Sequence, residues 1–357
     1  MNKTLILPVA GQSSRFPGMR PKWLLTMPDG RLMVEKSVEG IEISKFNKIL
    51  IVCLREHVEK YLDDESLKEI GKSFRHNHVE FCILDVPTKS QSETVAMAIK
   101  KSNISGAVFI KDCDNTFVYS WDGSNSIAVV DLNNVGLIDA KSKSYVVCDQ
   151  LGKVVNIVEK RVISNHFCCG GYGFSDVKEF LSVFNKINQN HEVYLSHVIY
   201  AMILSGTHFR CQPATNYRDW GTLREYYHYI GCNITLFCDV DGVLLKNGSK
   251  FGKTRWATPV IQENLVALAN LKKQGLLYLI ITSCRPESEI EYIKNSLEPH
   301  GLVPDRYIMG LPHTRRIIVN DFSATNPYPS AIAINLERDG MILSKMLDGI
   351  FKDFNQR

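Results

Sequence analysis

Short apolar runs rich in β-branched residues alternate with amphipathic stretches through the first third of the chain. The apolar runs occupy residues 4–9, 48–54 and 106–112, and the helix-like stretches occupy residues 57–74 and 92–102. This alternation predicts an α/β domain whose sheet is largely parallel.

The next apolar runs follow one another without helices between them. They are residues 126–132, 144–149 and 153–160. Because strands without crossover helices usually pair antiparallel, we expect a mixed extension of the sheet across residues 125–175. Two amphipathic helices are predicted after it, over residues 176–187 and 191–206.

A second start is visible at residues 233–245, "NITLFCDVDGVLL", where a new alternation begins. Helices are expected over 260–275 and 287–301, and further strands over 276–283 and 315–321. A chain of 357 residues also exceeds what one hydrophobic core usually serves. We therefore predict two α/β domains: residues 1–230, with a Rossmann-like mixed sheet, and residues 231–357, smaller and also Rossmann-like.

Composition narrows the class of protein. Hydrophobic residues make up 45% and charged residues 22% of the chain, as in ordinary globular proteins. The net charge of +4 is small, and no Lys/Arg block is long enough to follow a nucleic-acid backbone. We therefore expect no nucleic-acid partner.

The cysteines and the N-terminal apolar run bear on the cellular compartment. The ten cysteines are scattered and form no CxxC pair, which argues against a zinc site and a redox motif. The first apolar run, about six residues, is too short for a signal peptide or a membrane span. These features predict a cytoplasmic protein with no membrane partner.

The loop after the first strand has the composition of an anion-binding turn. Its mostly small residues let backbone N–H groups face a phosphate. They are Ala10, Gly11, Gln12, Ser13 and Ser14. Arg15 adds a guanidinium, and Lys22, after Pro21, adds a mobile ammonium. The stretch fits a triphosphate-binding loop, and a solvated loop without a ligand is the less favoured alternative.

Acidic residues follow the strand predicted over 106–112. Asp112 and Asp114 stand at its carboxyl end, where open α/β sheets bind ligands, and carboxylate oxygens suit Mg²⁺. Two solvated loop aspartates are the alternative. Asp219, just before Trp220-Gly221-Thr222, is a candidate for a further metal ligand.

In their order along the chain, these motifs resemble those of the sugar-phosphate nucleotidyltransferases, over about residues 3–228. The motifs are Ala-Gly-x-x-x-Arg at 10–15, Pro21-Lys22, Asp114-Asn115, Glu159-Lys160, Gly170-Gly171-Tyr172-x-Phe174 and Asp219-x-Gly-Thr. The resemblance implies a Rossmann-like enzyme that uses Mg²⁺ and converts an NTP and a sugar phosphate to an NDP-sugar and pyrophosphate.

The resemblance also implies roles for individual residues. Residues 10–14 would bind the nucleotide, and Arg15 and Lys22 would hold its phosphates as catalytic residues. The implied metal ligands are Asp114 and Asp219, with Asp112 nearby. The implied acceptor-binding residues are Glu159 for hydroxyls, Lys160 for the phosphate, and Gly171.

Some residues depart from the family pattern. Ser13 stands where a second glycine is usual, and residues 86–99 lack the glycine of the element beside the base. The base is therefore not defined by these residues, and CTP or UTP is the donor we prefer. The "DCD" motif also fits a metal-dependent glycosyltransferase, but such an enzyme needs no cationic pair like Arg15 and Lys22.

Acidic and hydroxyl residues also follow the strands of the second domain. In "DVDG", Asp239 can attack phosphorus and Asp241 can protonate the leaving oxygen. Thr282 and Ser283 end the next predicted strand and can hold a phosphoryl group. Asp321 ends the last predicted strand, as a further Mg²⁺ ligand beside Asp239 and Asp241.

This order resembles the haloacid dehalogenase superfamily, specifically its phosphatases, over about residues 233–340. That superfamily uses a lysine to neutralise the phosphoryl oxygens. Here Arg315 is the preferred substitute, and Arg316 and Lys294 are the other candidates. Asn320 stands where an aspartate is common, so loss of turnover is an alternative to phosphatase activity.

These expectations combine into one hypothesis. The chain would be a bifunctional enzyme with one Mg²⁺ in each domain, acting on an NTP and a small phosphorylated sugar or polyol. Such a fusion suits the synthesis of surface-polysaccharide precursors. The alternative is a nucleotidyltransferase with an inactive second domain. The oligomeric state stays open, a homo-oligomer included.

Overall fold

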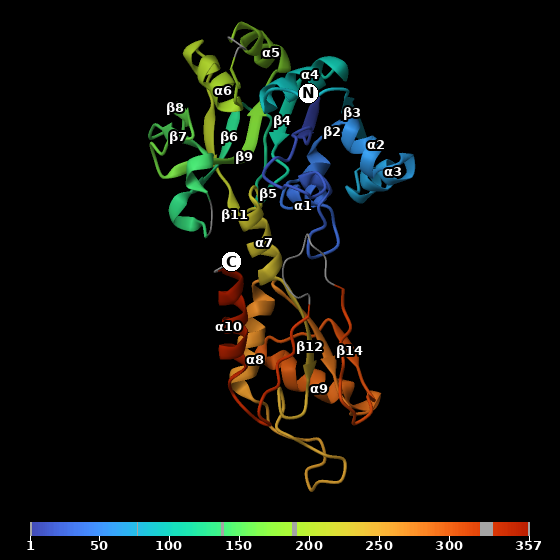
Figure 1. Ribbon diagram of the computed structural model, residues 1–357. Helices are drawn as coiled ribbons and strands as arrows, with labels where there is room; N and C mark the ends of the chain where they lie inside the picture. The colour runs from blue at the N-terminus through green and yellow to red at the C-terminus, as the bar shows by residue number, and fades with distance from the viewer. Residues whose placement is uncertain (1, 77, 137–138, 188–190, 322–330, 356–357) are drawn as a thin grey trace. The chain divides into compact units, whose positions relative to one another are not determined.

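The computed structural model describes residues 2–76, 78–136, 139–187, 191–321 and 331–355 (Figure 1). The chain forms two compact units, residues 1–226 (unit 1) and 227–357 (unit 2). Their division lies inside helix α7 (Leu223–Cys232), as does the boundary predicted at residue 230.

Unit 1 is built on a mixed sheet with nine strands among the described residues. Its main path is β10–β6–β9–β4–β1–β2–β3, and β7 and β8 extend it beside β9. The strands are β1 (Lys3–Pro8), β2 (Lys48–Leu54), β3 (Val79–Leu84), β4 (Ala107–Lys111), β6 (Ser126–Asp131), β7 (Ser144–Cys148), β8 (Val154–Glu159), β9 (His166–Phe174) and β10 (Arg210–Pro213). From β4 to β3 the strands are parallel, whereas β9 is antiparallel to β4 and β6, and β7 to β8. The predicted α/β class and the mixed extension are confirmed.

Both faces of this sheet carry a hydrophobic core, because side chains alternate along each strand. In β1, Ile6 packs into one core, and Leu5 and Leu7 pack into the other. The first core includes side chains of α4 (Gln91–Lys101), α5 (Val177–Lys186) and α6 (Leu195–Leu204). The second includes side chains of α1 (Met33–Ser37), α2 (Arg55–Tyr61) and α3 (Asp64–Ser73).

The helix predicted over residues 57–74 is interrupted. α2 ends at Tyr61, α3 begins at Asp64, and the Asp63 side chain accepts a hydrogen bond from the backbone N–H of Ser66. An aspartate that caps a new helix in this way favours a break over one continuous helix.

A short antiparallel ribbon brings distant parts of unit 1 together. It pairs β5 (Asn115–Val118) with β11 (Thr215–Asp219), and Asp219 lies opposite Asn115. The ribbon therefore places Asp219 beside the loop that follows β4, about a hundred residues earlier in the sequence.

Unit 2 contains a parallel sheet in the order β12 (Ile234–Asp239), β13 (Leu277–Thr282) and β14 (Arg306–Ile308). Its longer helices are α8 (Gln262–Lys273), α9 (Ile290–Leu297) and α10 (Leu343–Asn355). Its core gathers Val240, Leu265, Leu279 and Ile293, among others. The predicted strand and helix alternation is present as far as α9.

The prediction of a strand over residues 315–321 is wrong. These residues form no strand, and Ile317, Ile318 and Val319 are 79%, 57% and 90% exposed. The edge of β13 away from β12 is occupied by β14, which forms from the less apolar "RYI". A short apolar run is compatible with a strand, but only a pairing partner makes it one.

None of the helices formed by the described residues has the length and apolar composition needed to cross a bilayer.

Candidate active site

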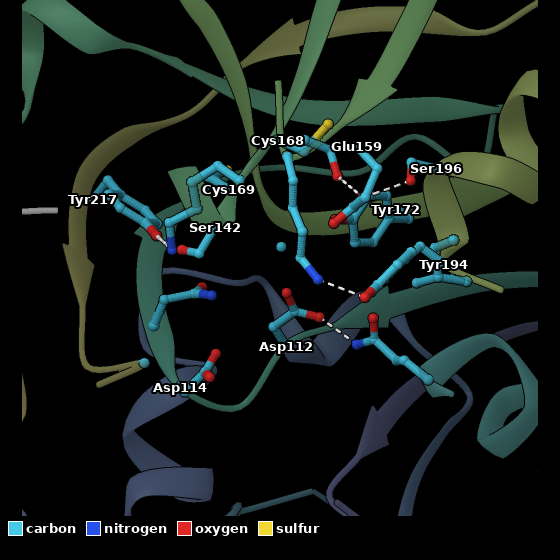
Figure 2. A pocket seen from close by; sticks show the side chains of 18 of the residues that line it. Asp112, Asp114, Ser142, Glu159, Cys168, Cys169, Tyr172, Tyr194, Ser196 and Tyr217 are labelled. Carbon is cyan, nitrogen blue, oxygen red and sulfur yellow. Dashed lines mark hydrogen bonds between the residues drawn. The ribbon is translucent and has the colours of Figure 1, made fainter. Parts of the chain in front are cut away.

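A cavity of about 340 Å³ lies beyond the carboxyl end of β4, beside β9 and the β5/β11 ribbon (Figure 2). Its lining is rich in charged side chains. The cations are Arg15, Lys143 and Lys160, and the acids are Asp112, Asp114, Glu159, Glu192 and Glu225. A polar cavity of this size with both signs of charge suits a small ligand that carries phosphate and hydroxyl groups.

Lys22 and Asp114 form an ion pair, with Nζ 2.5 Å from Oδ2. Lys22 begins the 3₁₀ turn η1 (Lys22–Leu24). Burial acts to lower the pKa of Lys22, but the Asp114 carboxylate raises it above its usual value. Burial likewise acts to raise the pKa of Asp114, but the Lys22 ammonium holds it well below the usual range. Both groups are therefore charged at neutral pH.

Lys143 and Asp219 form a second ion pair. The Tyr217 hydroxyl also donates to Asp219 Oδ2, at 2.9 Å. Burial acts to lower the pKa of Lys143, but Asp219 raises it above its usual value. The sequence did not single out Lys143, because a lysine just before a strand carries no motif.

Asp114 and Asp219 face a common space beside Gly221. A Cβ atom on Gly221 would lie 3.1 Å from Asp219 Oδ1 and 3.5 Å from Asp114 Oδ2. Asp112 instead accepts a hydrogen bond from Gln91 Nε2 at 2.5 Å. Burial and the neighbouring Asp114 raise the pKa of Asp112 to about 6.

This pair of carboxylates fits a magnesium ion. Mg²⁺ is usually held by one or two protein carboxylates, with waters and substrate phosphates completing its shell. Within the described ranges, no three His, Cys, Asp or Glu side chains gather as an all-protein metal site would require. Asp112 is therefore not brought to Asp114 and Asp219 as a third ligand.

The predicted nucleotide-binding loop leads into the Lys22 turn. Ser13 has a φ of +52°, and its Oγ accepts a hydrogen bond from the Lys22 backbone N–H at 2.9 Å. Ala10 is buried, whereas Gly11, Gln12 and Ser14 are exposed. Arg15 is the member of this loop that belongs to the cavity lining.

Glu159 lies across the cavity from Asp114 (Figure 2). Lys160, the next residue in the sequence, also lines the cavity. Glu159 Oε2 accepts hydrogen bonds from the hydroxyls of Ser144 and Ser196, the latter at 2.6 Å. Lys160 has a φ of +55°, and its Nζ donates to the Tyr194 hydroxyl at 2.5 Å. These serines and this tyrosine were not predicted, because isolated hydroxyl residues carry no sequence signal.

Gly170 and Gly171 have different surroundings. Gly170 belongs to the cavity lining. A Cβ on Gly171 would lie 2.8 Å from ring carbons of both Phe109 and Phe117, which pack in the core. Gly171 is thus a packing position, and Gly170 is the glycine of this pair that faces the cavity.

In unit 2, Asp239 ends β12 and pairs in register with Thr282, which ends β13. Arg316 reaches both: Nη2 lies 3.4 Å from Asp239 Oδ1, and Nη1 lies 3.2 Å from Thr282 Oγ1. Arg316, rather than the predicted Arg315, is therefore the arginine at these strand ends. Ser283 is buried beside Thr282.

Asp241 is paired with an arginine that the sequence did not single out. The Arg285 guanidinium is fully buried and donates to both Asp241 oxygens, Nε at 3.0 Å and Nη2 at 2.7 Å. It also donates to the Trp256 carbonyl at 3.0 Å. The bidentate geometry fixes the orientation of the Asp241 carboxylate.

Asp321 does not join this site as predicted. It lies in an exposed stretch outside any strand. In the described parts of the chain it forms no cluster with Asp239 and Asp241 that could bind a metal. The strand expected over 315–321, which would have brought Asp321 to the carboxyl ends of β12 and β13, is absent.

Unit 1 shares its fold with solved sugar nucleotidyltransferases. A nucleoside-diphosphate-sugar pyrophosphorylase from Vibrio cholerae RC9 is 18% identical with a TM-score of 0.54, covering 63% of this chain and 99% of that one. The inositol-1-phosphate CTP transferase from T. maritima is 17% identical with a TM-score of 0.50, covering 63% and 91%. A UDP-glucose pyrophosphorylase complexed with UDP-glucose is 16% identical with a TM-score of 0.52, covering 64% and 97%.

At these identities the likeness shows the fold of unit 1. No family model matches the sequence. No curated protein matches it either.

Proposed function

We propose that unit 1 transfers a nucleotidyl group from an NTP to a small sugar or polyol phosphate and releases pyrophosphate. The observation that carries this proposal is the convergence of Asp114 and Asp219 on the space beside Gly221, each paired with a lysine. Paired carboxylates and lysines next to a polar cavity match the needs of phosphate chemistry.

The reaction needs alignment and charge neutralisation more than a strong base. An oxygen of the acceptor phosphate, already anionic at neutral pH, attacks the α-phosphorus of the NTP. The bond from that phosphorus to the bridging oxygen breaks, and pyrophosphate leaves with the electron pair. Arg15, Lys22 and Lys143 stabilise the charge on the phosphates.

Asp114 and Asp219 are the residues that would hold Mg²⁺, which when bound supplies further neutralisation of the phosphate oxygens. The two lysines then have a second role. In the ion pairs they balance the charge of the carboxylates, and with substrate present their ammonium groups can turn to phosphate oxygens.

The part of the cavity lined by Glu159 and Lys160 suits the acceptor. We assign Glu159, held by two serine hydroxyls, to hydrogen bonds from acceptor hydroxyls, and Lys160 to the acceptor phosphate. The donor we propose is CTP or UTP. Two structural neighbours, a CTP transferase and a UDP-glucose pyrophosphorylase, are named for cytidine and uridine nucleotides.

For unit 2 we propose a phosphomonoesterase of the haloacid dehalogenase type. The observation that favours it is the approach of Arg316 to both Asp239 and Thr282 at adjacent strand ends. Asp239 would attack phosphorus, and the ester oxygen would leave with a proton from Asp241, whose carboxylate would first have to take up that proton and turn away from Arg285. Water would then hydrolyse the aspartyl phosphate. A Mg²⁺ ion would bind at Asp239, because both oxygens of Asp241 already accept hydrogen bonds from Arg285.

The two activities together fit the synthesis of surface-polysaccharide precursors. Two alternatives compete with this scheme. Unit 2 could lack turnover and serve assembly, as the bidentate engagement of Asp241 by Arg285 would allow. A metal-dependent glycosyltransferase is the other alternative, and the Lys22–Asp114 pair beside Arg15 favours NTP use over it.

The nucleotidyltransferase proposal is tested by pyrophosphate release. The protein is incubated with Mg²⁺, each of the four NTPs and a panel of sugar and polyol phosphates. We expect acceptor-dependent pyrophosphate with CTP or UTP, and a loss of about 100-fold or more in Asp114→Ala. Asp29→Ala is the matched control, because Asp29 pairs with Arg31 and Lys36 and is not part of the cavity lining. No acceptor-dependent pyrophosphate with any NTP would refute the proposal.

A further inference from the structure

Lys111 is a lysine inside the core of unit 1. It ends β4, and its side chain is fully buried, with none of its surface exposed. An ammonium group taken out of water is costly unless hydrogen bonds replace its hydration. Its retention at this point therefore calls for a physical reason.

All three N–H groups of the Lys111 ammonium have acceptors in one short loop. Nζ donates to the Asp112 carbonyl at 2.5 Å, the Asn115 carbonyl at 2.9 Å and Asn115 Oδ1 at 2.6 Å. The Phe117 ring packs on it, with its centroid 4.6 Å from Nζ. The ammonium thus joins the end of β4 to the start of β5 across residues 112–115.

That loop carries one carboxylate of the proposed metal pair and is bonded to the strand that carries the other. Asp114 lies at its middle, and the Asp114 carbonyl accepts from the Trp220 backbone N–H at 2.8 Å. Asn115 lies opposite Asp219 in the β5/β11 ribbon. The position of Asp114 relative to Asp219 therefore depends on the shape of residues 112–115.

On the side away from the Lys111 ammonium, the loop packs closely against Gly170. A Cβ on Gly170 would lie 2.6 Å from Asp112 Oδ2 and 2.7 Å from Asn115 Nδ2. The Gly170 carbonyl accepts from the Asp112 backbone N–H at 2.8 Å. The loop is thus held between Gly170 and the Lys111 ammonium.

We propose that Lys111 is a positioning residue that fixes residues 112–115 so that Asp114 and Asp219 face one divalent cation, an inference that rests on the proposed function of unit 1. Lys111 is not part of the cavity lining, so it acts through the loop and not on substrate. An apolar side chain of similar length would fill the same space without the cost of burying a charge. The three loop acceptors explain why a cation stands there instead.

The test measures metal binding directly. Mn²⁺ is titrated into wild type, Lys111→Met and Lys111→Gln, and free Mn²⁺ is followed by electron paramagnetic resonance. Urea unfolding of each variant shows that the protein measured is folded. Because residues that orient metal ligands typically contribute 10–100-fold to affinity, we expect the Mn²⁺ dissociation constant to rise about tenfold or more in both variants.

The matched control is Lys48→Met, which removes a lysine of β2 that pairs with Glu80 at 2.9 Å. It should bind Mn²⁺ like wild type. Folded Lys111 variants with wild-type Mn²⁺ affinity would overturn the proposal. So would failure of both variants to fold, since Lys111 would then serve the sheet and not the loop. Mn²⁺ binding is independent of turnover, so a wild type that binds Mn²⁺ but releases no pyrophosphate would refute only the proposed reaction.

Discussion

At the scale of single residues, Ser13 answers a question that the sequence left open. The nucleotidyltransferase pattern has a glycine at this position, and the backbone of Ser13 has the left-handed φ of +52° that glycine adopts without strain. For an L residue this conformation costs about 1–2 kcal/mol. The serine hydroxyl, however, accepts the Lys22 backbone N–H at 2.9 Å, a bond that glycine cannot make.

Replacing Ser13 should therefore separate backbone strain from the support of Lys22. In Ser13→Gly we expect the KM for the NTP to rise about fivefold, the equivalent of one hydrogen bond of about 1 kcal/mol. Stability should change by less than about 1 kcal/mol, because relief of strain opposes the larger entropy of the unfolded chain. Pyrophosphate-release kinetics and thermal unfolding measure the two effects. Ser13→Ala is the control: it should show the same KM without relief of strain, and an unchanged KM in both variants would contradict this role.

At the scale of elements, the apolar pattern predicted the parallel strands and where they end. Asp112 and Asp114 were expected after a strand and do follow β4. The β5/β11 ribbon was not predicted, because "NTFV" and "TNYRD" are short and largely polar, and their pairing spans about a hundred residues. The strand wrongly predicted over 315–321 has the opposite cause. These residues are apolar enough for a strand, but the prediction assumed a pairing partner that they do not have among the residues the structure describes.

The ends of β12 and β13 carry two arginine–aspartate pairs of unequal burial, which predicts unequal effects on stability. Arg285 is fully buried, so Asp241→Asn removes its bidentate charge partner, leaves the weaker pairing with Glu289 at 4.0 Å, and should destabilise unit 2 by about 3 kcal/mol. The side chains of Arg316 and Asp239 are 43% and 39% exposed, so Asp239→Asn should cost about 1 kcal/mol or less. Urea unfolding of the whole chain, followed by circular dichroism, measures both. Equal losses of unfolding free energy in the two variants would show that the Arg285–Asp241 pair does not stabilise unit 2 more than the Arg316–Asp239 pair does.

At the scale of the whole molecule, the sequence predicted more of the residues in the candidate site than of the residues that hold them in place. Arg15, Asp114 and Asp219 could be predicted as site residues because each belongs to a short motif, and these motifs follow one another in a characteristic order along the chain. Lys111, Lys143 and Arg285 could not, since a lone cation in or beside a strand is usually on the surface. Their roles depend on which segments the fold brings together, and a linear pattern does not contain that information.

Because the two proposed sites lie in separate units, we also predict that the two activities can be lost independently. Asp239 lies in unit 2 and Asp114 in unit 1, and each unit has its own core. We expect Asp239→Asn to abolish release of inorganic phosphate from phosphomonoesters while acceptor-dependent pyrophosphate release continues, and Asp114→Ala to do the reverse. The two products are assayed separately on one preparation of each variant.

The matched control for unit 2 is Asp348→Asn, which changes an exposed aspartate of α10 and should leave both activities intact. The mild destabilisation expected of Asp239→Asn makes unfolding an insufficient explanation for a lost phosphatase. Phosphate release that persists in Asp239→Asn would remove Asp239 as the nucleophile. Absence of phosphate release in wild type across the panel would instead favour the alternative in which unit 2 binds without turnover, because the nucleotidyltransferase site would remain testable in the same sample.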